Sequence, residues 1–119
     1  LQGLVRHMTE VERAWFLRTF AGETAPPIYY SDDDPDGDFD HLEPAKVDEE
    51  MAMFHETLER CREIEATAVS LDETGLRRGK PCSLRWIMLH MIEEYARHNG
   101  HADLIRESID GRVGNDPPR

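Results

Sequence analysis

The 119-residue chain lacks several features that would mark particular classes of protein. It has no apolar run close to the roughly 20 residues that a membrane-spanning helix needs, and no signal-peptide pattern at its start. Its two cysteines, Cys61 and Cys82, are too few and too far apart for a disulfide framework or a CxxC metal site. These absences predict a cytoplasmic protein with two reduced thiols and no membrane partner.

Positive charge is also scarce. Lys and Arg number 14 against 25 Asp and Glu, which gives a formal net charge of −11, and seven of the acids crowd into positions 32–43. Phosphates would be repelled by such a surface, so nucleic acid is excluded as a partner. The length suits a compact domain with one core, and we predict a single helical domain over residues 1–119.

Three stretches show the 3–4 spacing of apolar residues that is typical of amphipathic helices. They are Leu1–Phe20, Ala45–Ala66 and Leu84–Ile109. No capping residue precedes the first, so we expect that an earlier segment is missing from this chain. Ser83 is a natural N-cap for the last helix and Gly111 a natural stop, with a frayed tail beyond it.

The two connections between these helices, residues 21–44 and 67–82, are predicted to be loops because they are rich in proline, glycine and aspartate. The first satisfies the calcium-loop pattern D-x-D-x-D-G-x5-E at Asp32, Asp34, Asp36, Gly37 and Glu43. Pro26 and Pro27 block the helix that should precede such a loop. A solvated acidic loop is therefore the preferred interpretation, with calcium binding as the alternative.

The last helix carries two ionisable residues, Glu94 and His98, within its apolar face. The residues expected to point inward are Leu84, Ile87, Met91, Glu94, His98, Ala102, Ile105 and Ile109. An unpaired carboxylate there is costly, so it should be paired, protonated or bound to a cation. An arginine of another helix could pair with Glu94. A metal ion explains both residues, because side chains at i and i+4 reach one ion.

A third ligand must come from elsewhere, and His7 points inward on the first helix with Leu4 and Val11. The alternative for His7 is a core histidine hydrogen-bonded to a neighbouring helix. One carboxylate and two imidazoles suit zinc, and nickel, iron or manganese less selectively. Three protein ligands leave a position open, as catalytic zinc sites do.

At these residues the chain resembles a known family. The first helix, LVRHMTEVERAWFLRTFAGE, and the last, SLRWIMLHMIEEYARHNGHADLIRESIDG, are similar to the DinB-like superfamily. The resemblance is to an uncharacterised actinobacterial-type branch close to mycothiol-dependent enzymes. It implies an all-α four-helix bundle with a metal ion between its helices. The family's first helix has no counterpart here, so three long helices are expected.

Carried over residue by residue, the resemblance assigns the metal ligands to His7, Glu94 and His98. Many relatives have histidine at the position of Glu94, whereas mycothiol-dependent isomerase-like members have glutamate. His101 stands where the family often has glutamine, so it is either an extra ligand or a residue that supports one.

The activity implied by the resemblance is that of a metal-dependent transferase or isomerase. Such an enzyme joins a low-molecular-weight thiol such as mycothiol to an electrophilic substrate. Catalytic residues are not assigned, and Arg97 and the Arg77–Arg78 patch are candidates for binding substrate. A metal-containing binding or stress protein without turnover, or a hydrolase that uses metal-bound water, are the alternatives. The apolar residues Trp86 and Ile28 leave room for a homodimer.

Overall fold

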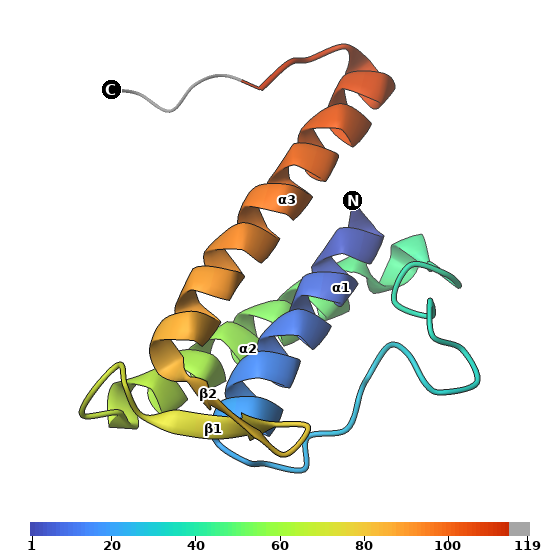
Figure 1. Cartoon of the computed structure of the whole chain (residues 1–119). Coiled ribbons are helices and arrows are strands. Elements are labelled where there is room, and N and C mark those ends of the chain that lie inside the picture. Colours follow the sequence, from blue (N-terminus) through green and yellow to red (C-terminus); the bar gives the residue numbers. More distant parts are fainter. Residues whose placement is uncertain (115–119) are drawn as a thin grey trace.

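The computed structural model describes residues 1–114 as three long helices and a small two-stranded sheet (Figure 1). The elements are α1 (Gln2–Glu12), its π-helical continuation η1 (Arg13–Phe20), the 3-10 turn η2 (Pro44–Lys46), α2 (Val47–Thr67), β1 (Thr74–Arg77), β2 (Lys80–Ser83) and α3 (Leu84–Asp110). The three predicted helices are confirmed. Part of the predicted frayed tail, residues 115–119, lies outside the described residues. No helix of the described chain is long and apolar enough to span a membrane.

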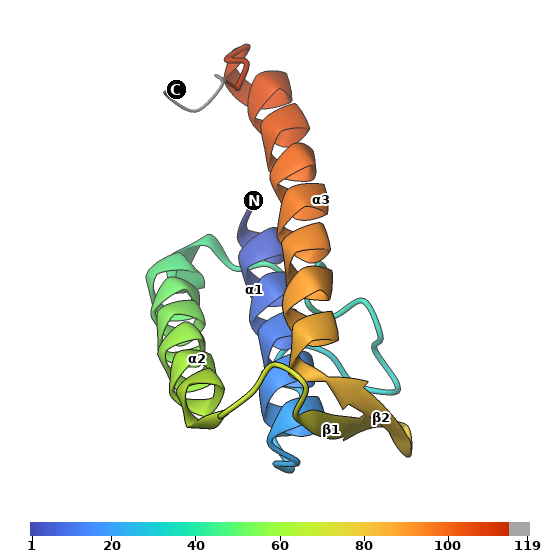
Figure 2. The same ribbon diagram turned by 60° about the vertical axis from the view of Figure 1, so that its left-hand side comes forward.

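The first helix forms the centre of the molecule. α1 lies between α2 and α3, which pack against it rather than against each other (Figure 2). The core is made of buried apolar residues from all three helices and η1: Met8, Phe16, Leu17, Cys61, Ile64, Leu84, Ile87 and Met91. Because α1 is covered on several sides, it also buries polar residues, and one of them, Glu10, lines the cavity described below.

The last helix begins and ends as its sequence predicts. The Ser83 hydroxyl accepts a hydrogen bond from the Trp86 backbone N–H (3.2 Å), and Gly111 ends the helix in the left-handed region with φ 70°. The inward prediction is wrong for Ile105 and Ile109, which are 37% and 70% exposed. The reason is the length of α3, which projects past the start of α1, so that no other helix or strand of the described residues packs against its far end (Figure 1).

The prediction of a loop over residues 67–82 is also wrong in its second half. β1 and β2 pair antiparallel from Thr74 opposite Ser83 to Arg77 opposite Lys80. The two residues between them, Arg78 and Gly79, both have positive φ (51° and 77°), as a type I′ hairpin turn requires. Both strands are largely exposed, so they do not need apolar side chains on one face. Their sequence therefore lacks the apolar–polar alternation from which a strand is predicted.

The acidic connection, residues 21–44, lies along the side of α1 (Figure 1) and is tied to it by polar contacts. Arg6 Nη2 donates to the Gly37 carbonyl (2.6 Å). Glu43, the last residue of the calcium-loop pattern, pairs with Lys46 instead (Nζ–Oε1 2.7 Å). Most acids of this connection are exposed as predicted, but Asp38 is buried. The loop therefore has a solvated side and a side that belongs to the site.

Candidate metal site

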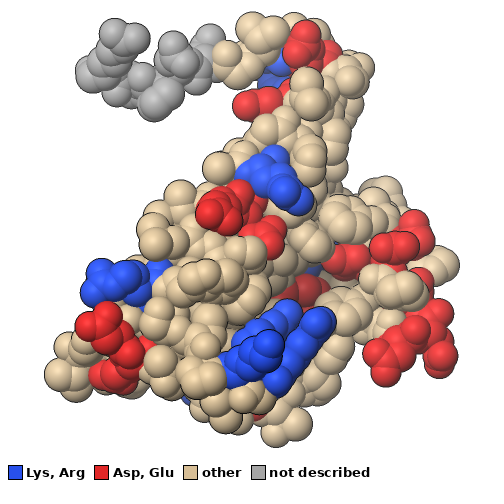
Figure 3. All heavy atoms as spheres, in the orientation of Figure 1, with Lys and Arg blue, Asp and Glu red and all other residues tan. Residues whose placement is uncertain are grey.

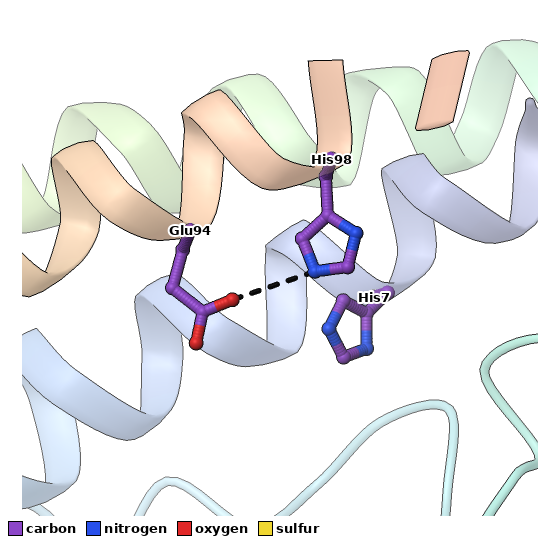
Figure 4. A group of neighbouring side chains, drawn as sticks. All are labelled: His7, Glu94 and His98. Carbon is purple, nitrogen blue, oxygen red and sulfur yellow. Dashed lines mark ion pairs between the residues drawn. The ribbon is translucent and has the colours of Figure 1, made fainter. Parts of the chain in front are cut away.

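The structure brings together the three residues that the sequence singled out as metal ligands. Figure 4 shows Glu94 and His98 projecting from α3 towards the His7 ring on α1. One ligand atom of each residue lies within 4.8 Å of the others, and all three side chains are half-buried. The His98 Nε2 and Glu94 Oε2 atoms are 3.4 Å apart, and the His7 and His98 ring centroids are 4.7 Å apart.

The packing of α1 against α3 places these residues opposite one another. The two helices run antiparallel, so His7 meets His98 while Trp15, two turns later on η1, meets Trp86 and His90. Glu94 and His98 lie one turn apart on the same face of α3 because they are four residues apart. The site is therefore held between two regular helices, which fix side-chain positions more firmly than loops do.

His7 has an outer partner that the sequence did not reveal. Its Nδ1 atom lies 2.7 Å from Asp38 Oδ2, and the Asp38 side chain is 8% exposed. This bond holds the ring with its Nε2 atom free for a metal ion, as a carboxylate behind a metal-binding histidine does. The alternative of a histidine bonded to a neighbouring helix does not describe His7, because its partner lies in the acidic loop. No sequence signal separates Asp38 from its six acidic neighbours.

His101 lies behind His98. The Nδ1 atoms of the two rings are 3.2 Å apart, while His98 presents Nε2 to Glu94. His101 is not in the group of ligand atoms that gathers around His7. Of the two roles expected for His101, the geometry favours support of a ligand.

The partners of Glu94 are histidines rather than the arginine that was the alternative to a metal. In the part of the chain that the structure describes, its Oε1 atom lies 3.1 Å from His90 Nε2 and its Oε2 atom 3.4 Å from His98 Nε2. The His90 ring stacks on Trp86 with an interplanar angle of 10°. Glu94 is thus fixed on one side and open towards His7 on the other.

Burial affects the protonation of His98. It lowers the pKa of this imidazole below its ordinary value, and the neighbouring His7 lowers it further. The neutral imidazole is the form that binds a metal ion, so little proton competition is expected near pH 7.

We next compared the chain with known protein families. Residues 1–111 match the family model described as mycothiol S-transferase. The chain belongs to this family. No curated protein and no solved structure gives a significant match. The membership confirms the resemblance to a DinB-like branch near mycothiol-dependent enzymes.

In this member of the mycothiol S-transferase family, a cavity of about 340 Å³ adjoins two of the three residues. His7 and Glu94 line it together with Glu10, Trp15, Tyr30, Asp38, Arg77 and His90. Of the basic residues considered for substrate binding, Arg77 reaches the cavity, whereas Arg78 and Arg97 are exposed. Figure 3 shows basic side chains gathered over the β1–β2 hairpin, from which Arg77 comes.

The cysteines of the chain are not part of this site. Cys61 and Cys82 are both free, and burial raises the pKa of each thiol above its ordinary value. Both therefore stay protonated near pH 7, so neither is an activated nucleophile. Neither cysteine lines the cavity that His7 and Glu94 share.

Proposed function

We propose that His7, Glu94 and His98 bind a divalent metal ion and that the chain joins the thiol of mycothiol, through its sulfur atom, to an electrophilic substrate. The observation that carries this proposal is the gathering of one carboxylate and two imidazoles within 4.8 Å, in a chain whose family is named for this transfer. Donor atoms around a tetrahedral zinc ion with bonds of about 2.1 Å are about 3.4 Å apart, so small side-chain movements would close the site.

Zinc is the metal that this donor set suits best, and nickel, iron and manganese are the alternatives. When bound, such an ion lowers the pKa of a thiol and supplies a nucleophile near neutral pH. The outer bonds to Asp38 and His101 would keep the two rings facing the ion.

The residues of the cavity would then hold the two reactants. In the transfer, the thiol loses its proton and a carbon–sulfur bond forms. The electrophile either releases a leaving group with its electron pair or, if the sulfur adds to a double bond, takes up a proton.

The four-helix form of the fold is also a proposal. α2 and α3 diverge on the side of α1 opposite His7, and an apolar groove of about 470 Å³ lies between them. Phe54, Met91 and Tyr95 are among the residues that line it. A fourth helix of a DinB-like bundle would pack in this groove.

Metal analysis tests the site, and a transfer assay tests the activity. Protein purified without a histidine tag from zinc-replete cells should carry about one zinc per chain, and Glu94→Gln and His98→Ala should each reduce this without loss of helical circular dichroism. Zinc-loaded protein should then accelerate the reaction of mycothiol with a chlorinated aromatic dye. Metal without transfer would instead support a binding protein, and stoichiometry near zero in the wild type would contradict the site.

A further inference from the structure

The cavity beside His7 and Glu94 contains a carboxylate that the metal site does not use. Glu10 lies one turn after His7 on the same face of α1, so the two side chains share this cavity. The Glu10 residue is 3% exposed, which is unusual for a carboxylate. Glu10 is not one of the residues whose ligand atoms gather around His7. A metal ion bound by that group would therefore not explain why the Glu10 carboxylate is buried.

One oxygen of Glu10 has a structural role and the other has no partner. Oε1 accepts hydrogen bonds from the backbone N–H groups of Ile28 (2.5 Å) and Tyr29 (2.7 Å), which ties the acidic loop to α1. Oε2 is buried and has no hydrogen-bond partner among the described residues. A buried carboxylate oxygen without a donor is costly, so a donor group on a bound molecule would relieve that cost.

The other walls of the cavity indicate what kind of molecule could supply this donor group. Trp15 supplies an aromatic wall, and the Arg77 guanidinium covers one face of its ring at 4.5 Å from the ring centroid. The acids Glu10, Asp38 and Glu94 outnumber Arg77 in the lining, so an anionic ligand would be repelled. Uncharged hydroxyl groups on a compact ring suit an acceptor oxygen beside an aromatic face.

We propose that Glu10 is a specificity-determining residue whose Oε2 accepts a hydroxyl hydrogen from the sugar part of the thiol co-substrate. This inference rests on the proposed function, because mycothiol carries its cysteinyl thiol on a hydroxyl-rich pseudodisaccharide. The thiol would face His7 and Glu94, while the sugar part would extend along the cavity towards Trp15. Glu10 would then distinguish the sugar-bearing thiol from simple cysteine derivatives.

The test uses Glu10→Gln in zinc-loaded protein, with mycothiol and N-acetylcysteine as probes in titration calorimetry. The glutamine oxygen can still accept from Ile28 and Tyr29, which places its NH₂ group where Oε2 stood and so removes the charged acceptor from the ligand hydroxyl. We expect mycothiol binding to weaken about 10- to 100-fold, with binding of N-acetylcysteine and zinc content unchanged. Glu12→Gln is the matched control, because Glu12 is equally buried on α1 but lines the groove on the other side.

The outcomes separate this inference from the proposed function. Wild type that binds neither thiol overturns both. Wild type that binds mycothiol no better than N-acetylcysteine overturns the inference alone, and this comparison holds even if the variant fails to fold. Equal mycothiol affinity in wild type and Glu10→Gln overturns it as well, since the ligand would then not contact Oε2. An equal loss for both thiols would place the contact on their shared cysteinyl part and contradict the assignment to the sugar.

Discussion

Asp38 is the acid of residues 32–43 whose side chain turns inward onto a proposed metal ligand. Its bond to His7 Nδ1 fixes both the ring orientation and the tautomer that a metal ion requires. A helical period identifies inward-facing residues on a helix, but an irregular loop has no period. The contribution of Asp38 therefore depends on how the loop folds back along α1, and spacing alone could not reveal it.

We expect Asp38→Asn to lower zinc affinity about 10- to 100-fold, because the neutral amide supports the imidazole less strongly than the carboxylate does. Competition with a chromophoric chelator measures this directly. Asp36→Asn, an exposed acid of the same loop, should leave the affinity unchanged. If both variants bind zinc like the wild type, stacking of His7 on Phe39, with ring centroids 5.0 Å apart, is enough to orient the ring.

A second prediction at the residue scale concerns Glu12. Burial raises its pKa above the ordinary value of 4.5, and the hydrogen bond from the Tyr95 hydroxyl (2.7 Å) opposes that shift only in part. The folded state therefore holds the Glu12 proton more tightly than the unfolded state does. This contribution to stability is fully present below pH 4.5 and is lost as the pH rises through the raised pKa.

Glu12→Gln removes this titration and keeps an acceptor for Tyr95. The variant should be more stable than the wild type at pH 7, and the difference should shrink towards pH 4. Urea unfolding at a series of pH values measures both free energies. A difference that stays constant with pH would show that the Glu12 carboxylate is not responsible.

At the scale of elements, the three helices follow from the spacing of their apolar residues and from local signals such as the Ser83 cap. The β1–β2 hairpin does not, because its strands are short, half-exposed and contain Pro81. What fixes the hairpin is contact with η1, a long-range feature. Since Arg77 reaches the cavity from β1, this unpredicted element also supplies one wall of the proposed substrate site.

Two glycine substitutions test that contact. A Cβ atom on Gly75 would collide with the Thr19 carbonyl and the Phe20 Cα of η1, so Gly75→Ala should destabilise the fold by about 1–3 kcal/mol. Gly100 lies within α3 with open space around it, so Gly100→Ala should stabilise by up to about 1 kcal/mol. Equal effects of the two substitutions in urea unfolding would mean that the hairpin does not rest on η1.

At the scale of the whole molecule, the pairing of α1 with α3 connects segments from opposite ends of the chain. This pairing could be predicted from the sequence because Glu94, on an apolar face, needed a partner, and because the chain resembles a family whose metal ligands lie on both helices. The central position of α1 and the free end of α3 could not be predicted in this way. A helix pattern shows which face is apolar but not how far its neighbour extends, as the exposed Ile109 demonstrates.

A metal ion bound by His7, Glu94 and His98 would link α1 to α3, so it should stabilise the whole fold. Zinc at 100 times its dissociation constant should add about 2.7 kcal/mol to the free energy of unfolding, a rise in Tm on the order of 10 °C. Thermal melts followed by circular dichroism measure the shift. His98→Ala should abolish it, whereas His55→Ala should preserve it, because His55 is exposed on α2.

The net charge of −11 provides a rival explanation for such a shift, since any divalent cation relieves repulsion among surface acids. Calcium at the same concentration distinguishes the two. It prefers oxygen ligands and would act on the acidic loop, whereas zinc prefers the imidazoles between α1 and α3. A rise with zinc alone that requires His98 would therefore place the ion between the helices. Equal rises with both cations would attribute the effect to surface charge.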